Sequence, residues 1–496
     1  MTIRVGRILA VSFIGLAVTW GMARGAETAA ATAEAVYPPE VVRADFDELY
    51  ARLRASHYNL YARRSEANYD RLHVSMRTSF TTPLTRSQVA MRFQRFLAYG
   101  RIAHARIDFP REAFEAWRSA GGREFPLGLR MVGGKIYVTE NLSGAADLLP
   151  GDELLDVNGT RTQQWFERVT APLSADNAYM ASAMLEFSLP RLVWVAAPDA
   201  SAFALRVRSA DGKPRVVTVP ARTRVEIDAA RAAQPKTHEL SWDAREYRML
   251  DDGVAYLRPG PFYESDPNAP NPWDPRAFSA FVDEAFRSFI KAGARTLLID
   301  LRDNAGGDNS FSDLMLNWFA TRPYRFASRF EIKVSDAAVE SNRKRLELAG
   351  DSPDATSLKF AAAYAGRGPG DIVSFEIPTA HPRQSERFAG KVWVLINRHS
   401  YSNTVMVAAT VQDYGFGTVI GEETSDLATT YGAMEQFELS RTGVVVGFPK
   451  AYIVRPSGAT GARGVVPDIA IASPIVPGKE DIVLQKALEI VGRRRR

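Results

Sequence analysis

The sequence predicts an α/β protein of several domains, with a helical N-terminal region, then a small β-rich domain, then an α/β domain. Three observations lead to this prediction. The chain has 496 residues, more than a single hydrophobic core usually supports. Its composition, 46% hydrophobic and 24% charged, is that of a globular protein. Along the chain, the apolar pattern changes from helical spacing to short strands, and then to alternating strands and helices.

Residue counts exclude several kinds of chemistry. The chain has no cysteine, which rules out disulfides, thiolate zinc sites, iron–sulfur clusters and cysteine nucleophiles. It has six histidines, too few for a dense metal centre, so we expect no metal and no cofactor. The net charge of +5 is small for this length and comes partly from Arg493–Arg496, so we expect no nucleic-acid partner.

The N-terminus has the layout of a secretory signal peptide. Arg4 and Arg7 precede an apolar run from Ile8 to about Val18, and small residues follow. The run is too short for a typical transmembrane helix. We therefore expect residues 1–25 to be a signal peptide, and the protein to be periplasmic or secreted, with no stable membrane insertion beyond this segment. An uncleaved anchor is the alternative.

Residues 36–118 form the predicted helical region. Apolar residues recur there at spacings of three, four and seven, as on one face of a helix. Thr85 is the expected N-cap of a further helix. The apolar positions of the first helix are Val42, Phe46, Leu49, Leu53 and Leu60.

Residues 119–225 have the pattern of short strands and tight turns. The runs Leu127–Val132, Lys135–Val138 and Glu153–Val157 are separated by Gly-Gly, Pro-Gly-Asp and Asn-Gly turns, and Asp211-Gly212 predicts a hairpin. The order of these segments resembles a PDZ domain of bacterial proteases, in which a strand receives a peptide by strand addition. A plain small β-domain is the alternative.

Residues 240–475 alternate strands and helices. "GVAYLRPGPF", "RTLLIDLR", "KVWVLIN" and "GTVIGEE" predict strands of a largely buried sheet, and "DPRAFSAFVDEAFRSFIKAG" and "TVMVAATVQDYG" predict helices. In such sheets, the catalytic and binding residues lie just after the carboxyl ends of the strands. The segment 335–379 is rich in Ala, Gly, Pro and Asp, which indicates a lid or an exposed insertion. Residues 476–496 are the expected C-terminal helix and basic tail.

Two strand ends carry candidate functional residues. After "LLID", Gly306 and Gly307 allow a sharp turn that presents bare N–H groups. After "VWVLIN", the stretch "RHSYSNT" enters a helix, so a serine there would lie at a helix N-terminus, where developing negative charge is stabilised. Together the two turns could build an oxyanion hole for acyl transfer.

Three blocks make the resemblance specific: "LLIDLRDNAGGDNSFSD", "VWVLINRHSYSNTVMVAATVQDYGFGTVIGEET" and "PKAYIVRPSGATGARGVVPDIAI". They resemble the catalytic domain of the C-terminal-processing (tail-specific) serine peptidases, which has a ClpP/crotonase-like α/β fold. The resemblance implies that Ser402 is the nucleophile and Ser400 a turn residue. It also implies an oxyanion hole made by the N–H groups of Asn403 and of Gly306 or Gly307. The alternative for Ser402 is a simple helix N-cap.

The base is where the sequence departs from the processing peptidases. Their lysine position is occupied by Leu427. The tricorn-core-like and retinoid-binding-protein-like branches instead carry a histidine at the end of the helical region, and His104 stands there, although Ile102-Ala103 replace the usual preceding pair. A histidine can take the serine proton near neutral pH. His104 is therefore the predicted general base. The weaker candidates are His399, His57 and Lys450.

The acid that would orient the histidine is not fixed by spacing. Glu423 and Glu422 follow a strand end and are the first candidates. The later "GVVPD" region offers Asp468 and the non-acidic Arg463. We expect Asp303 and Asn304 to hold the glycine turn rather than take part in catalysis.

The prediction is an exported serine endopeptidase that hydrolyses polypeptides through an acyl-enzyme on Ser402. Resemblance to the family implies that substrates are engaged through their C-termini, in the groove of the PDZ-like domain. One alternative is a non-catalytic protein that binds a peptide or an apolar ligand on the same fold. An esterase or amidase using the same serine is another. The natural substrate and the oligomeric state are left open by the sequence.

Overall fold

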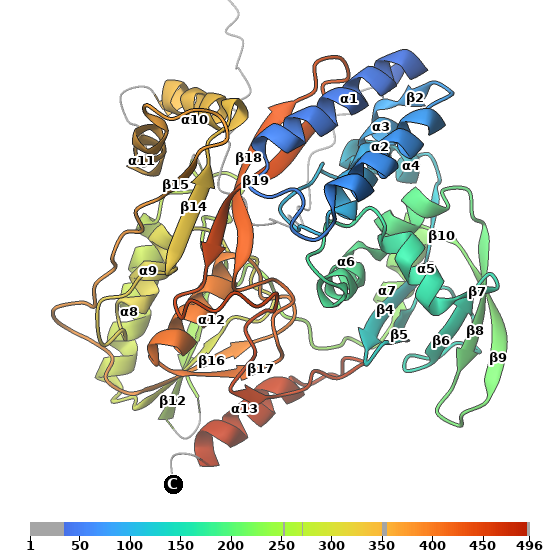
Figure 1. Ribbon diagram of the computed structural model, residues 1–496. Helices are drawn as coiled ribbons and strands as arrows, with labels where there is room; N and C mark the ends of the chain where they lie inside the picture. Colours follow the sequence, from blue (N-terminus) through green and yellow to red (C-terminus); the bar gives the residue numbers. More distant parts are fainter. Residues whose placement is uncertain (1–33, 251–252, 270, 350–354, 494–496) are drawn as a thin grey trace, which may run out of the picture.

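The computed structural model describes residues 34–250, 253–269, 271–349 and 355–493, so the predicted signal peptide lies outside the described residues. The helical region is present as predicted (Figure 1). Thr85 caps α3 and forms a capping box with Gln88, which satisfies two backbone N–H groups. The elements are β1 (Val36–Tyr37), α1 (Pro39–Ser56), α2 (Glu66–Ser79), β2 (Leu84–Thr85), α3 (Arg86–Tyr99) and α4 (Arg111–Ser119).

The β-rich region contains a sheet of order β4-β5-β6-β8-β9, with β7 paired to β6. The three predicted strand runs are strands, and the Asp211-Gly212 turn joins β8 to β9. β4 is an edge strand. The elements are β3 (Arg123–Glu124), β4 (Leu127–Val132), β5 (Lys135–Asn141), β6 (Glu153–Val157), β7 (Thr160–Arg161), α5 (Thr162–Thr170), α6 (Ala178–Ala196), β8 (Ala202–Arg208), β9 (Pro214–Pro220), β10 (Arg222–Thr223) and α7 (Arg224–Ala233).

The α/β region is built on a six-stranded sheet of order β11-β12-β13-β16-β17-β20. β11 pairs antiparallel with β12, and the other neighbours pair parallel. The carboxyl ends of the parallel strands therefore meet at one edge. The elements are β11 (Glu246–Met249), β12 (Val254–Arg258), α8 (Arg276–Lys291), β13 (Thr296–Asp300), α9 (Asn309–Leu316), β16 (Lys391–Ile396), α12 (Asn403–Tyr414), β17 (Thr418–Gly421), β20 (Ile469–Ala470) and α13 (Ile482–Arg493).

Both faces of this sheet are covered. On one face, Phe286, Phe311 and Val407 from α8, α9 and α12 join a large apolar cluster. On the other, Val483 and Ala487 of α13 pack against the sheet. Among the described residues, none of the helices has the length and hydrophobicity that a membrane crossing requires. The covering of both sheet faces agrees with the continuous apolar runs in the sequences of its strands.

A second, antiparallel sheet of order β15-β14-β19-β18 extends from the α/β region towards α1 (Figure 1). The predicted insertion 335–379 contributes helices and a strand to this part, and α10 lies beside β18. The segment is therefore folded onto the body of the protein along its described length. The elements are β14 (Arg329–Lys333), α10 (Asp336–Ala349), α11 (Ala355–Tyr364), β15 (Ile372–Ser374), β18 (Thr430–Glu438) and β19 (Val445–Val454).

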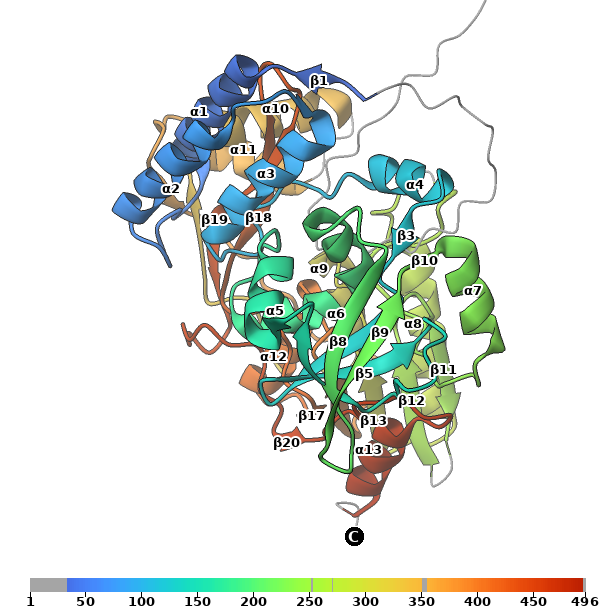
Figure 2. The same ribbon diagram turned by 90° about the vertical axis from the view of Figure 1, so that its right-hand side faces the viewer.

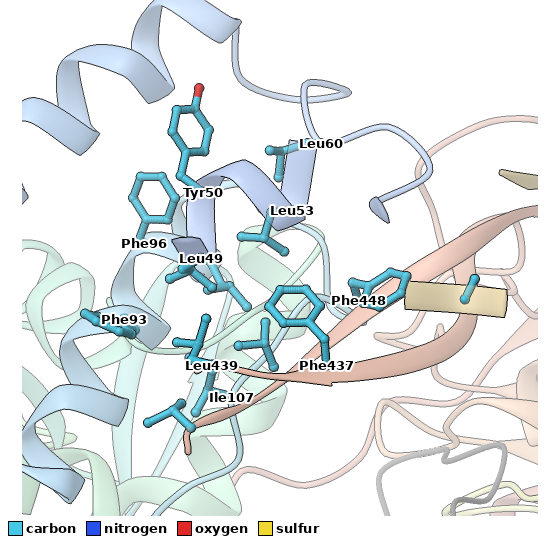
Figure 3. Close-up of a cluster of buried hydrophobic side chains, with 14 of the residues drawn as sticks. Leu49, Tyr50, Leu53, Leu60, Phe93, Phe96, Ile107, Phe437, Leu439 and Phe448 are labelled. Atoms are coloured by element: carbon cyan, nitrogen blue, oxygen red, sulfur yellow. The ribbon is translucent and has the colours of Figure 1, made fainter. Parts of the chain in front are cut away.

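The helical region and the β18–β19 hairpin share one hydrophobic core, which Figure 3 shows. Val42, Phe46, Leu49 and Leu53 of α1 are buried in it, as the helical spacing requires, while Leu60 is also buried but lies beyond the end of α1. This core fixes the helical region on the hairpin. It thereby sets the position of the turn that follows α3, which contains His104. The labelled side chains are Leu49, Tyr50, Leu53, Leu60, Phe93, Phe96, Ile107, Phe437, Leu439 and Phe448.

Candidate active site

The candidate site lies past the carboxyl ends of β13, β16 and β17, which are neighbours in the sheet. Parallel strands bring their carboxyl ends to the same edge, so the three following turns meet there. The first turn contains Gly306 and Gly307, the second contains Ser402, and the third contains Asp426.

Ser402 stands at the turn between β16 and α12, in a rarely adopted backbone conformation with φ 55° and ψ −123°. This region is close to glycine-only, and such strain is held mainly at functional sites. Ser402 occupies the N-cap position of α12, but its hydroxyl makes no capping hydrogen bond. The simple N-cap alternative is therefore wrong, and the side chain is left for another role.

The glycine turn packs directly on the serine turn. Gly306 has φ 88°, and a methyl group added to it would lie 2.6 Å from Tyr401 O, and 2.8 Å from both Asn403 N and Ser402 Cβ. Only glycine fits this approach. The Gly306 N–H donates to Asn304 Oδ1 at 2.9 Å. Within the described ranges, the N–H groups of Gly307 and Asn403 have no hydrogen-bond acceptor.

The other predicted turn residues hold these loops. Asn304 Nδ2 donates to Gly260 O at 2.6 Å, and Ser400 Oγ donates to Leu301 O at 2.8 Å. Asp303 accepts a hydrogen bond from Asn397 Nδ2 at 2.7 Å. These contacts agree with the structural role expected for Asp303, Asn304 and Ser400.

Asp426 was not predicted and lies directly against the nucleophile turn. Its Oδ2 accepts a hydrogen bond from the Ser402 N–H at 2.7 Å, and its Oδ1 accepts one from the Leu427 N–H at 2.9 Å. The residue is buried. Burial and the nearby carboxyl of Asp176 raise the pKa of Asp426 to about 7, against the effect of its two N–H donors.

His104 lies in the turn after α3 and is buried. Burial and the nearby Arg106 lower its pKa to about 4, while hydrogen bonding to the Tyr431 backbone acts in the opposite direction. The imidazole is therefore neutral at pH 7 and able to accept a proton. Its Nδ1 has no hydrogen-bond partner among the described residues.

One apolar cluster links the His104 turn to the serine turn, and a backbone bridge fixes the His104 turn on β19. Ala103 lies in an apolar cluster with Ala175 and Met180, and Tyr401, next to Ser402, packs against that cluster. The Arg106 N–H and C=O form a bridge with Gly447 of β19. The described hydrogen bonds do not include one between His104 and the Ser402 hydroxyl. Catalytic hydrogen bonds are often long in unliganded sites.

Asp176 connects the two turns electrostatically and was not predicted either. It is buried, its Oδ1 accepts a hydrogen bond from Arg63 at 3.0 Å, and its Oδ2 has no partner among the described residues. Burial raises its pKa to about 6, against the effects of Arg63 and of a hydrogen bond with the Ala103 backbone. Two buried carboxyl groups with pKa values near neutrality thus flank Tyr401.

The weaker base candidates have other partners. His399 Nδ1 lies 3.2 Å from Asp303 Oδ1, and its Nε2 lies 3.3 Å from Glu186 Oε2. Lys450 is buried against Glu435, 2.5 Å away. The ring of His57 is buried, and its Nδ1 accepts a hydrogen bond from the Asn59 N–H at 3.1 Å.

The predicted acids are bound by arginines. Glu422 accepts hydrogen bonds from Arg398 at 3.0 Å and from Arg130 at 3.5 Å, and Glu423 pairs with Arg463 at 2.7 Å. The described hydrogen bonds and ion pairs do not join either carboxylate to His104. Asp468 accepts a hydrogen bond from the Val419 N–H at 2.8 Å and supports β17.

Comparisons with known proteins agree with this geometry. Residues 254–471 match the model of Peptidase family S41, and this range contains every candidate residue named above for the glycine, serine and Asp426 turns. A search of curated proteins finds no match. Together with the serine turn, the fold defines a serine peptidase. Residues 254–471 thus carry a Peptidase family S41 domain.

Solved structures share the fold over nearly the whole chain. Mature CPAF is 16% identical, with a TM-score of 0.60, and the match covers 92% of this chain and 96% of that chain. A CPAF mutant gives a TM-score of 0.61 with the same identity and coverage. The photosystem II D1 C-terminal processing protease is 15% identical, with a TM-score of 0.41, and the match covers 87% of this chain and 93% of that chain. At these identities the similarity concerns the fold alone.

Proposed function

We propose that the protein is an exported endopeptidase in which Ser402 forms an acyl-enzyme and His104 is the general base. One observation carries the proposal above the others: the strained Ser402 turn with its uncapped hydroxyl at the N-terminus of α12. A helix cap would need neither the strain nor a free hydroxyl.

In this proposal, the Ser402 hydroxyl attacks the peptide carbonyl while the neutral imidazole of His104 takes its proton. The N–H groups of Asn403 and Gly307 hold the oxyanion, because the Gly306 N–H already donates to Asn304. His104 then returns the proton to the leaving amine as the C–N bond breaks. Water hydrolyses the acyl-enzyme by the same proton route.

Asp426 supports the nucleophile in the proposed mechanism. By accepting the Ser402 N–H, its carboxyl group stabilises the unusual backbone conformation of the serine. We assign no orienting acid to Glu422 or Glu423, because arginines already neutralise both.

Substrate engagement through the PDZ-like region is also part of the proposal. β4 is an edge strand beside α6, so a polypeptide C-terminus could add to it as a further strand. Arg398 Nη1 donates to Met131 O at 3.0 Å, so an added strand would pair with the part of β4 that precedes Met131. Export rests on the Arg4 and Arg7 signal pattern in the sequence.

The test is labelling of the purified protein with a fluorophosphonate, followed by mass-spectrometric mapping of the modified residue. We expect modification of Ser402 in the wild type, none in Ser402→Ala, and a loss of about 100-fold or more in rate in His104→Ala. Ser374→Ala and His381→Ala, at exposed positions, are the matched controls and should label normally.

Two results would reject the proposal. Equal labelling of wild type and Ser402→Ala would place the reactive group elsewhere. A folded wild type that neither labels nor hydrolyses any peptide would instead favour a binding protein on the same fold. A normal rate in His104→Ala would remove only the base from the mechanism.

A further inference from the structure

A cavity of about 1090 Å³ lies between the helical region and the β-rich region. Residues of α3, α5 and α6 line it, and α3 lies above α5 and α6 in the views of Figures 1 and 2. Apolar side chains on these helices, Met91, Phe166 and Trp194, line part of the wall. This space is separate from the turns of the candidate active site. We call it the arginine cavity, because several arginines line it.

Four arginines line the cavity: Arg64, Arg92, Arg95 and Arg101. Arg64 is engaged, since its Nε donates to Tyr99 O at 3.3 Å. The side chains of the other three make no hydrogen bond or ion pair with any residue in the described ranges. All three side chains are exposed, and partial burial together with the neighbouring Arg92 lowers the pKa of Arg95.

The carboxylates in the wall do not neutralise these arginines. Glu167 accepts a hydrogen bond from Gln163 at 2.9 Å, and Glu34 accepts hydrogen bonds from the backbone N–H and hydroxyl of Ser87. Arg92, Arg95 and Arg101 are exposed, and together they form a basic patch beside apolar side chains that an acidic ligand would complement.

The cavity adjoins the candidate active site. Ala175 and Ala181 line its wall, and the apolar cluster to which they contribute also contacts Tyr401, the residue before Ser402. On this side the cavity therefore reaches the apolar cluster that also holds Ala103 of the His104 turn. The volume is large enough for several residues of extended polypeptide.

We propose that the arginine cavity binds an acidic segment of the polypeptide substrate, near the bond that is cleaved. This inference rests on the proposed peptidase function. The chain's own residues 1–33 are a poorer match in charge, because they carry Arg4, Arg7 and Arg24 against one acidic residue, Glu27. Several acidic side chains on one strand could meet guanidinium groups on α3 and on the turn after it.

The binding test uses a fluorescein-labelled oligoglutamate peptide and the full-length Ser402→Ala protein, with fluorescence anisotropy as the readout. We expect salt-dependent binding that weakens about tenfold or more in Arg92→Gln/Arg95→Gln. The control is Arg367→Gln/Arg387→Gln, which removes the same charge from exposed positions elsewhere and should bind normally. An oligomer of glycine and serine should not bind.

The specificity test digests a proteome-derived peptide library with the active protein. We expect Asp and Glu to be enriched near the cleaved bonds, and this enrichment to disappear in Arg92→Gln/Arg95→Gln but not in the control. Absence of any cleavage would reject the proposed function, while the anisotropy measurement would still decide the cavity's ligand. Equal oligoglutamate binding by both double variants, or binding of anionic lipid vesicles without binding of the peptide, would overturn the inference.

Discussion

At the residue scale, the turn that follows β17 lacks the lysine of a lysine-based site. Leu427 is buried and cannot accept a proton, while Asp426 turns its carboxyl group onto the Ser402 N–H at 2.7 Å. We therefore propose a base from the helical region. His104, buried with a lowered pKa and an unpartnered Nδ1, has the properties that this task requires.

The lowered pKa of His104 predicts an unusual pH dependence. The imidazole must be neutral to accept the serine proton, so the rate of fluorophosphonate labelling should fall only as the pH drops through about 4. In Arg106→Gln, the pKa of His104 should rise, because the neighbouring positive charge is lost, and the acid limb should move to higher pH. A limb near pH 6.5 in the wild type would contradict this.

Gly306→Ala should disable the site. The added methyl group would overlap Tyr401 O, Asn403 N and Ser402 Cβ, in addition to the cost of a positive φ. We expect at least a ~10-fold loss of labelling rate and about 1–3 kcal/mol of destabilisation. Gly212→Ala is the control: Gly212 has φ 80° and open space around it, so this substitution has only the conformational cost of the positive φ. Similar labelling rates in the two variants would show that the close approach is unimportant.

Candidate site residues could be predicted from the sequence where they lie in a turn directly after a strand. The structure places Gly306 and Ser402 together in the way the two turns suggested. Asp426 and Asp176 could not be found in this way, because their partners lie far away in the chain: Asp426 bonds to Ser402, and Asp176 to Arg63. Spacing carries no information about such contacts. After "GEET", the sequence pattern points only to Leu427, at the position of the missing lysine.

At the element scale, sequence periodicity predicted the elements that have one buried face. The strand β4 has the predicted bounds, and Thr85 begins α3 as expected. The helix α6 was not predicted. It contains Pro190, and most of its residues are apolar, because it packs between other elements and has no broad polar face. Without that polar face, the helical period is absent from the sequence.

The C-terminal helix α13 should be necessary for stability. Ala487 is fully buried against the sheet face formed by residues such as Tyr256 and Trp393. A carboxylate there would be desolvated without a partner, so Ala487→Asp should lower the free energy of unfolding by several kcal/mol, about 3 or more. Lys486→Asp, at the exposed neighbouring position, is the control for helix propensity and charge. Urea denaturation of both variants measures the difference, and equal midpoints would show that α13 contributes little.

At the scale of the whole molecule, charged side chains join the β-rich region to the α/β region. Arg398 pairs with Glu186 of α6 at 2.6 Å, and His399 lies between Glu186 and Asp303. Burial lowers the pKa of His399, but hydrogen bonds to Asp303 and Glu186 outweigh it and raise the pKa to about 10. His399 is therefore charged at neutral pH.

This ion cluster makes stability depend on pH. The pKa of His399 is raised above its ordinary value of 6.5, so its contribution is complete below about pH 6.5 and is lost as the pH rises through about 10. His399→Gln should cost about 1–3 kcal/mol at pH 6 and much less at pH 10.5. His381→Gln, at an exposed position, should show no such trend. A cost for His399→Gln that is constant with pH would refute the assignment.

The distribution of the proposed catalytic pair along the chain has a consequence for biosynthesis. His104 belongs to a helical region made early, and Ser402 to a turn made late, and their neighbours Ala103 and Tyr401 share one apolar cluster only in the folded chain. A nascent chain, or a fragment left by a single cut between them, would contain an incomplete form of the proposed proton-transfer pair. The enzyme would thus be harmless to its own unfolded copies until the entire chain has folded.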